Sequence, residues 1–127
     1  MPFRKILLID DDTEDQEIFK TALDQVSKTT EFTTLTNARE ALKMLVSKQL
    51  NPDVIFLDLN MPIMSGQDFL REVKMRSETQ HIPVIIFSTS SNAATVKLTK
   101  EMGAVDFITK PDRFDKLVNI LKPIITD

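Results

Sequence analysis

The stretch that decides the fold is Asp53-Val54-Ile55-Phe56-Leu57-Asp58-Leu59-Asn60-Met61-Pro62. Its short apolar run between polar residues is typical of a parallel strand that is buried on both faces. Asp58 interrupts the run and Pro62 stops it, so this carboxylate stands at the carboxyl end of the strand. Ligands of open α/β sheets bind at that end. The position indicates chemistry for Asp58, although a role as a loop cap is an alternative on this stretch alone.

Outward from this strand, apolar runs alternate with segments of helical periodicity along the chain. The runs predict strands at 6–9, 31–36, 54–57, 84–87 and 105–109, and the apolar stripes predict helices within 13–26, 37–46, 69–76, 93–102 and 114–121. Because each predicted strand is followed by a predicted helix, we expect a parallel sheet between two layers of helices. Right-handed crossovers then favour the α/β class, a flavodoxin-like doubly wound (βα)5 three-layer sandwich with strand order 2-1-3-4-5, in which 31–36 is an edge strand.

Three helix ends carry recognisable signals. Thr13-Glu14-Asp15-Gln16 matches a capping box for the first helix, and Asn37 caps the second in a similar way. Gly103 takes the position that follows a helix end. The helix before it, 93–102, has few apolar anchors, which indicates mobility.

The last residues leave the oligomeric state open. Pro123 is expected to end the final helix, because proline interrupts helical hydrogen bonding. Ile124 and Ile125 beyond it either pack on the body of the protein or support a dimer. We expect a monomer or a weak homodimer.

Length and composition limit the function classes. The 127 residues fit a single domain, 1–127, with no output domain expected, and the lack of cysteine excludes disulfides and thiolate metal sites. A net charge of −3, a pI near 5.2 and the lack of a basic cluster argue against direct binding of nucleic acid. The early apolar run 6–9 is too short for a membrane span or a signal-peptide core, so we expect a cytoplasmic protein without membrane attachment.

The predicted sheet brings polar side chains from four strand ends to one edge. These side chains are Asp10 with Asp11, Asp58, Ser88 and Lys110. Carboxylates held this close raise one another's pKa unless a cation neutralises them. Oxygen ligands without His or Cys suit Mg²⁺ better than other metals, and no regular loop offers the alternating ligands of a calcium site. The alternative is an acidic pocket that binds nothing specific.

The same edge has the parts of a phosphoryl-transfer site. A carboxylate such as Asp58 can act as a nucleophile toward phosphorus and form an aspartyl phosphate. Such transfer needs mainly positioning and compensation of charge, which a metal, the lysine Lys110 and the hydroxyl of Ser88 would supply. Taken singly, Lys110 could be a solvated strand end and Ser88 a helix cap; the combination is specific.

In these residues the chain resembles the receiver domains of two-component response regulators, of the single-domain chemotaxis kind. The resemblance covers essentially the whole sequence. It rests on Ile-Asp-Asp at 9–11, Leu-Asp-Leu-Asn-Met-Pro at 57–62, Gly66, Pro83-Val84 to Ser88, Gly103-Ala104, and Phe107 to Lys110-Pro111.

The resemblance implies a phosphoacceptor and a metal site. Asp58 is expected to be the residue that becomes 4-aspartylphosphate. Asp11, Asp58 and the backbone carbonyl of Asn60 are expected to bind Mg²⁺ directly, and Asp10 through a water molecule.

It also implies a switch around the acceptor. Lys110 is expected to pair with Asp58 and then with the phosphoryl group, and its bond to Pro111 is expected to be cis. Ser88 would turn toward the phosphoryl group, and Phe107 would follow it inward. Ser88 stands where threonine is usual and so lacks the methyl group that restricts χ1. Phe107 stands where tyrosine is frequent, so its outward ring would expose an apolar edge without a hydroxyl, and we expect an inward ring, or one covered by a partner, even before phosphorylation.

Taken together, these features predict a phosphorylation switch rather than a turnover enzyme. A histidine kinase or a histidine phosphotransfer protein would donate the phosphoryl group, and the surface of helix 93–102, strand 105–109 and helix 114–121 would change. A separate downstream protein would bind that surface, or the signal would pass to the next carrier in a relay. Two other polar residues are candidates for lesser roles: Asp12 is expected to cap or lie at the surface, and His81 is expected to be a loop residue.

Three rival functions use the same fold or chemistry. A phosphatase of the haloacid-dehalogenase type needs a second aspartate two positions after the nucleophile as general acid, and Asn60 cannot serve. A flavin carrier fits the fold, but the acidic first loop would repel the flavin phosphate. The third rival is a receiver-like scaffold that is never phosphorylated, and only an experiment distinguishes it from a phosphorylation switch.

Overall fold

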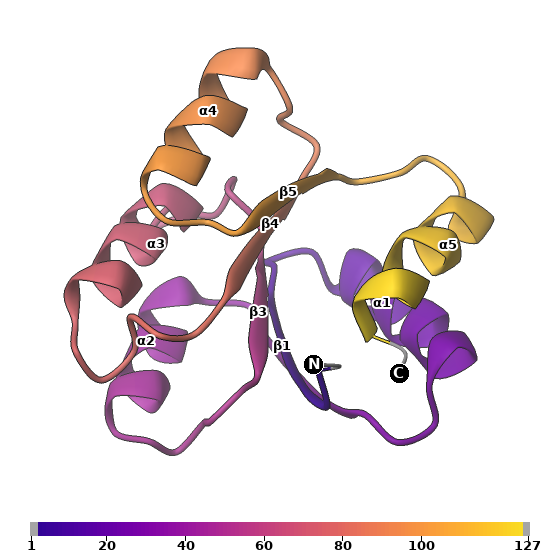
Figure 1. The fold of residues 1–127 in the computed structure, drawn as a ribbon, viewed down its shortest axis with the longest axis horizontal. Helices are drawn as coiled ribbons and strands as arrows, with labels where there is room; N and C mark the ends of the chain where they lie inside the picture. The colour runs from indigo at the N-terminus through magenta and orange to yellow at the C-terminus, as the bar shows by residue number, and fades with distance from the viewer. Residues whose placement is uncertain (1–2, 126–127) are drawn as a thin grey trace.

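The computed structural model describes residues 3–125 as a five-stranded parallel sheet with helices on both faces (Figure 1). The strand order β2-β1-β3-β4-β5 confirms the predicted doubly wound topology and the edge position of the second strand. The strands are β1 (Lys5–Ile9), β2 (Glu31–Leu35), β3 (Val54–Leu57), β4 (Val84–Ser88) and β5 (Asp106–Thr109). The helices are α1 (Thr13–Val26), α2 (Ala38–Val46), α3 (Gly66–Met75), α4 (Ala93–Glu101) and α5 (Phe114–Ile125).

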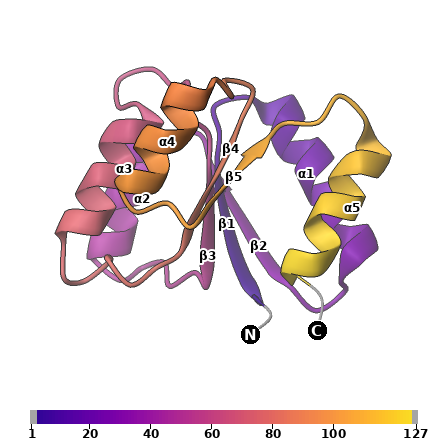
Figure 2. The same cartoon turned by 45° about the horizontal axis from the view of Figure 1, so that its top comes forward.

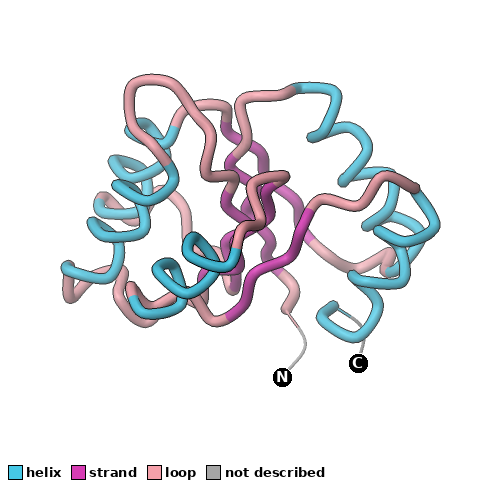
Figure 3. The backbone as a smooth tube through the Cα atoms, turned by 90° about the horizontal axis from the view of Figure 1, so that it is seen from above, coloured by secondary structure: helices cyan, strands magenta, loops and turns pink. Residues whose placement is uncertain are grey.

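The alternation of side chains along β1 divides the core into two clusters. Leu7 and Ile9 point into one cluster with α2 and α3, whereas Ile6 and Leu8 point into the other with α1 and α5. Figure 2 shows the corresponding layers, with α2, α3 and α4 on one side of the sheet and α1 and α5 on the other. Seen from above in Figure 3, the sheet lies between these two layers. We call the two groups the α2–α3 cluster and the α1–α5 cluster.

The register of the parallel strands aligns their carboxyl ends. Ile9 pairs with Leu57, and Ser88 pairs with Thr109. The residues after these strands stay in the ladder, because the N–H of Asp58 donates to the carbonyl of Ile9 at 3.0 Å and the N–H of Lys110 donates to that of Ser88 at 2.9 Å. The strands therefore bring residues 10, 58, 88 and 110 to one edge of the sheet.

The start of α1 differs from the predicted capping box. Asp12, not Thr13, is the N-cap, and its carboxylate accepts the backbone N–H groups of Glu14 at 2.9 Å and Asp15 at 3.3 Å. A hydroxyl cap at Thr13 would have accepted the N–H of Gln16, but that N–H donates to the backbone carbonyl of Asp12 at 3.1 Å, so Thr13 becomes the first helical residue. The capping role expected for Asp12 is confirmed. Asn37 caps α2 as predicted, by accepting from the N–H of Glu40 at 3.0 Å.

The last helix continues past Pro123, which corrects the expectation that proline ends it. Proline costs one helical hydrogen bond, but its fixed φ is compatible with a helix. Ile125 is only 2% exposed within the α1–α5 cluster, and Ile124 packs against the same cluster. Burial of these side chains favours the helical last turn, and Ile124 and Ile125 pack on the body of the protein.

The helix α4 is weakly anchored to the body of the protein, because Thr99 is the one buried residue among those of this helix. Gly103 has φ +115° and follows the end of α4, as expected for a residue after a helix. Within residues 3–125 no helix has the length and apolar character that crossing a membrane requires.

Candidate functional site

The centre of the site is the ammonium group of Lys110, at the end of β5. Its Nζ lies 2.7 Å from Oδ2 of Asp10, 2.9 Å from Oδ2 of Asp15 and 3.7 Å from Oδ2 of Asp58. The same nitrogen is 5.7 Å from the centroid of the Phe87 ring. Residues 10, 58 and 110, which the sequence placed at one edge, are therefore brought together.

Asp10 is the deepest charged group of the site. It is fully buried, its Oδ1 accepts the N–H of Asp12 at 3.0 Å and its Oδ2 accepts from Lys110. Burial raises the pKa of Asp10 above its ordinary value, and the hydrogen bond from Lys110 opposes that rise. For Lys110, burial acts to lower the pKa, but the hydrogen bonds to Asp10 and Asp15 outweigh it and leave the pKa raised. The lysine is thus held in its charged form.

Three carboxylates form a group that could hold a metal ion. Ligand oxygens of Asp10, Asp11 and Asp58 lie within 4.8 Å of one another. Asp10 and Asp58 are buried whereas Asp11 is exposed, so the group opens to solvent on the Asp11 side. An all-oxygen donor set with room for water fits a hard divalent cation such as Mg²⁺.

Side chains from the loops after β3 and β4 are linked beside Asp58. The N–H of Asn60 lies 3.4 Å from Oδ1 of Asp58, and the Asn60 amide donates to Oγ of Ser90 at 2.9 Å. Ser88 is fully buried and its Oγ accepts the N–H of Ser90 at 3.2 Å. Ser88 thus lies at the predicted edge, with its hydroxyl engaged by its own loop.

Gly66, a turn residue in the sequence pattern, permits a close approach of α3 to the backbone of Asp58 and Leu59. A Cβ atom at this position would overlap the carbonyl oxygen of Asp58 and lie 2.7 Å from Cα of Leu59. Ser65 caps the helix by accepting the N–H of Asp68 at 3.1 Å. The amino end of α3 is therefore packed directly on the backbone of residue 58.

Phe107 and Pro111 lie on either side of Lys110 along the chain. Phe107 is half-buried, and its ring packs against the α2–α3 cluster. The preference of the Phe107 ring for an inward position in solution stays a prediction. The Lys110–Pro111 bond corrects the expectation from the family resemblance, because no cis peptide bond occurs within residues 3–125. The trans form is the ordinary preference of an X–Pro bond.

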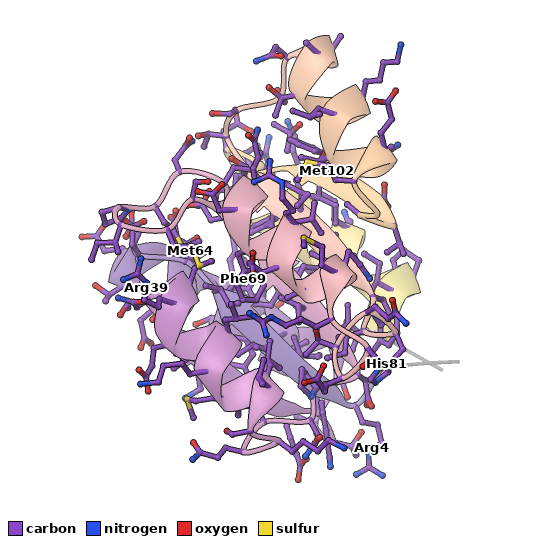
Figure 4. All side chains as sticks on the ribbon, turned by 90° about the vertical axis from the view of Figure 1, so that its left-hand side faces the viewer. Arg4, Arg39, Met64, Phe69, His81 and Met102 are labelled. Carbon is purple, nitrogen blue, oxygen red and sulfur yellow. The ribbon has the colours of Figure 1, made fainter. Side chains whose placement is uncertain are left out.

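Asp12 and His81 lie outside the charged centre, as expected. Asp12 caps α1. His81 lies in the loop before β4, beside Pro52 and Asp53 at the amino ends of the strands. In Figure 4 it lies toward the same end of the molecule as Arg4, which precedes β1, whereas Met102 lies toward the other end.

Asp15 is the site residue that the sequence reasoning missed. The sequence pattern assigns it to a capping box, yet its carboxylate contacts Lys110 from the first turn of α1. No local pattern identifies it, because Asp15 and Lys110 are 95 positions apart in the sequence and meet only through the fold. Gln16 also contributes, because its amide donates to the carbonyl oxygen of Asp10 at 2.6 Å.

Comparison with known proteins places this fold and site in a family. Residues 6–122 match the response regulator receiver domain, and the chain belongs to that family. It is thus a receiver domain of a two-component response regulator.

Curated relatives are longer proteins. The chain is 33% identical over 118 residues to a probable C4-dicarboxylate response regulator DctR of Bacillus subtilis, covering 93% of this chain and 50% of the relative. It is 32% identical over 124 residues to a protein-glutamate methylesterase/protein-glutamine glutaminase of Methanococcoides burtonii, covering 96% of this chain and 34% of the relative. The chain therefore spans half or less of the length of these relatives.

Solved structures of similar length share the fold. The phosphorylated cyanobacterial phytochrome response regulator RcpA superposes with a TM-score of 0.87 at 30% identity, covering 95% of this chain and 90% of that one. The Mn²⁺-bound form of response regulator Rcp1 gives 0.85 at 26% identity, covering 95% and 91%. Chemotaxis response regulator CheY4 of Vibrio cholerae gives 0.79 at 27% identity, covering 96% and 98%.

Proposed function

We propose that this chain is a phosphoacceptor response regulator in a two-component phosphorelay, with Asp58 as the acceptor. The observation that carries the proposal is the meeting of the Lys110 ammonium with the buried carboxylates of Asp10 and Asp58 beside the exposed carboxylate of Asp11. This arrangement offers one nucleophile, one fixed cation and an open oxygen site for a second cation. The structures of RcpA in a phosphorylated form and of Rcp1 in a Mn²⁺-bound form support the same chemistry by analogy.

The chemical step is transfer of a phosphoryl group between two protein side chains. A histidine kinase or a histidine phosphotransfer protein presents a phosphohistidine. A carboxylate oxygen of Asp58 forms a bond to phosphorus while the P–N bond breaks, and its electron pair stays on the imidazole nitrogen, which takes up a proton. In dephosphorylation, the oxygen of a water molecule attacks phosphorus and the bond between phosphorus and the Asp58 oxygen breaks. Its electron pair stays on the Asp58 carboxylate, and inorganic phosphate is released.

The metal ligands in this proposal are Asp11, Asp58 and the backbone carbonyl of Asn60, with Asp10 acting through a water molecule. When bound, Mg²⁺ neutralises the charge that develops on the phosphoryl oxygens. The chain itself orients the Asp58 carboxylate, since the N–H of Asn60 and the ammonium of Lys110 both face it. Gly66 contributes by letting α3 pack on the acceptor backbone.

Phosphorylation adds a charge of about −1.5 to −2 to Asp58. We propose that Lys110 then pairs with the phosphoryl group and that Ser88 turns its hydroxyl toward a phosphoryl oxygen, giving up the N–H of Ser90. Phe107 keeps an inward ring. The surface that changes is formed by α4, β5 and α5, where Leu98, Val105 and Phe114 are exposed; the weak anchoring of α4 supports this assignment.

The output in this proposal is binding of a separate downstream protein by the receiver domain, which acts in the cytoplasm as a monomer or weak homodimer. No direct contact with nucleic acid or membrane is part of it. Phosphorylation and dephosphorylation of Asp58 are self-catalysed, so the chain is not proposed as a turnover enzyme. Asn60 in place of a second aspartate gives no support to a haloacid-dehalogenase type phosphatase.

The test is incubation with Mg²⁺ and acetyl phosphate, followed by intact mass spectrometry, with Asp58→Asn as the control. The expected result is the addition of one phosphoryl group to the parent and none to the variant. Beryllofluoride with Mg²⁺ should shift the backbone amide signals of residues 58–60 and 88–90. If the parent shows neither the mass increase nor the shifts, the proposed function is wrong.

A further inference from the structure

The ammonium of Lys110 is shared unequally among three carboxylates. Asp10 and Asp15 lie at 2.7 and 2.9 Å, which are charge-assisted hydrogen bonds, whereas Asp58 lies at 3.7 Å, beyond hydrogen-bond length. Asp15 is not part of the group of Asp10, Asp11 and Asp58 that could bind a metal. Its carboxylate therefore contacts the lysine and not the proposed metal site.

We infer that Asp15 is a positioning residue that competes with Asp58 for Lys110 and thereby disfavours the phosphorylated state. This inference rests on the proposed function of Asp58 as phosphoacceptor. In the unphosphorylated protein, Asp15 holds the ammonium on the α1 side of the site. Phosphorylation draws the ammonium toward the phosphoryl oxygens, against the attraction of Asp15.

The competition follows from the number of donors and the sign of the charges. An ammonium group has three N–H donors, and two of them are engaged by Asp10 and Asp15. Asp10 is fully buried, so its 2.7 Å contact with Lys110 is the costlier of the two ion pairs to break. Asp15 is 34% exposed, so solvent can replace its contact at low cost. Asp15 is the partner that Lys110 gives up.

The position of Asp15 makes α1 sensitive to that exchange. A small cavity of about 60 Å³ lies between α1 and the start of the loop after β5, lined by Asp15, Ile18, Phe87, Lys110, Pro111 and Leu117. A shift of Lys110 toward Asp58 removes the ion pair that joins α1 to this loop. The first turn of α1 should therefore report the state of the site.

The simpler explanation is that Asp15 only favours the amino end of α1, where acidic residues interact well with the helix dipole. Glu14 shares that property, in the same turn and with the same charge, but no ion pair joins it to Lys110 in the described part of the chain. Glu14→Gln is therefore the matched control for Asp15→Asn. Asp15→Glu restores the charge and should restore the contact.

The experiment measures phosphorylation by acetyl phosphate with saturating Mg²⁺ in the parent, Asp15→Asn, Asp15→Glu and Glu14→Gln. Asp15→Asn should raise the maximal phosphorylation rate and slow the loss of the phosphoryl group, each by roughly 2- to 5-fold, the range that a partly exposed ion pair supports. Asp15→Glu and Glu14→Gln should match the parent. Thermal unfolding of each variant checks that all are folded.

Two results overturn the inference. One is a phosphorylation rate of Asp15→Asn equal to that of Glu14→Gln. The other is a slower rate in Asp15→Asn, which would mean that Asp15 assists Lys110 instead of competing for it.

A second measurement separates this inference from the proposed function. The chain has no Trp or Tyr, so Mg²⁺ binding is measured by calorimetry or by amide NMR shifts, without a phosphodonor. Asp15→Asn should weaken Mg²⁺ binding roughly 2- to 5-fold, because the released lysine competes for Asp58. Glu14→Gln should leave it unchanged. If Asp15→Asn does not change Mg²⁺ affinity, the inference is wrong even where Asp58 is phosphorylated; failure of the parent to accept phosphate refutes the proposed function instead.

Discussion

Lys110 at the end of β5 and Asp10 at the end of β1 form an ion pair of 2.7 Å across 100 positions of sequence, with the carboxylate fully buried. The pair ties an edge strand of the sheet to an inner strand, just where their carboxyl ends meet. A buried carboxylate without a cation is costly, so this contact serves stability as well as the proposed chemistry.

Lys110→Met should therefore destabilise the protein by about 3 kcal/mol, since it leaves Asp10 buried and unpaired. Mg²⁺ should recover part of that loss, because a divalent cation near Asp11 and Asp58 also offsets the charge of Asp10. Urea unfolding with and without Mg²⁺ measures both effects. Lys116→Met is the control: Lys116 pairs with Asp112 at the surface, so its removal should cost at most about 1 kcal/mol. Equal losses in the two variants would contradict this account.

Gly66→Ala should impair both stability and phosphorylation. The new Cβ would overlap the backbone of Asp58, which cannot give way without moving the acceptor, and overpacking of this kind costs about 1–3 kcal/mol. Gly103→Ala is a useful contrast, because its strain comes from φ +115° and from Cγ of Lys74 at 3.0 Å, and not from the backbone of Asp58. That variant should lose roughly 1 kcal/mol and still accept a phosphoryl group at the parental rate. A Gly66→Ala protein with parental phosphorylation kinetics would be the contrary result.

Asp53 predicts a pH dependence at the opposite edge of the sheet. Its carboxylate accepts the backbone N–H groups of Arg4 and Lys5, both at 2.9 Å, and these hydrogen bonds lower the pKa of Asp53 below 3.8. A carboxyl group whose pKa is lower in the folded state contributes stability above its unfolded pKa and loses it as pH falls through the folded pKa.

The difference in unfolding free energy between the parent and Asp53→Asn should therefore be constant near neutral pH and shrink below about pH 4. Urea unfolding at a series of pH values measures it, with Asp24→Asn as a matched removal of an exposed carboxylate elsewhere. A difference that grows on acidification would reverse the sign of the effect.

Phe107 should present a mainly buried ring before phosphorylation, because an outward ring would expose apolar surface without a hydroxyl to bond water. Its half-buried position against the α2–α3 cluster agrees with that expectation. Fluorine NMR of a label placed at Phe107 alone can report solvent exposure in the free protein. A label at Phe114, which is 38% exposed, supplies the reference for an exposed ring. Matching solvent effects at the two labels would refute the prediction.

The alternation of strands and helices, with right-handed crossovers, predicted the sheet order correctly, and with it the meeting of Asp10, Asp58 and Lys110 at one edge. The sequence pattern could not decide which of two adjacent polar residues caps a helix. Asp12 displaced Thr13 as the cap of α1. The choice between them depends on backbone geometry that periodicity does not contain.

Long-range packing decided the other differences. Pro123 is a helix breaker by local rules, but burial of Ile125 outweighs them. Asp15 became a partner of Lys110 only because β5 ends opposite the first turn of α1. The role of Gly66 depends on the distance between α3 and the acceptor strand. None of these relations can be derived from spacing along one segment.

The placement of the site on the sheet has a mechanical consequence. Asp10 and Asp58 follow β1 and β3, which have a neighbouring strand on each side, whereas Lys110 and Phe107 belong to β5 and its carboxyl end, and β5 has a neighbour on one side only. The inner strands β1 and β3 are therefore held more firmly than the edge strand β5. Under the proposed phosphorylation of Asp58, β5 should therefore move more readily than β1 and β3, and the change should pass outward through β5.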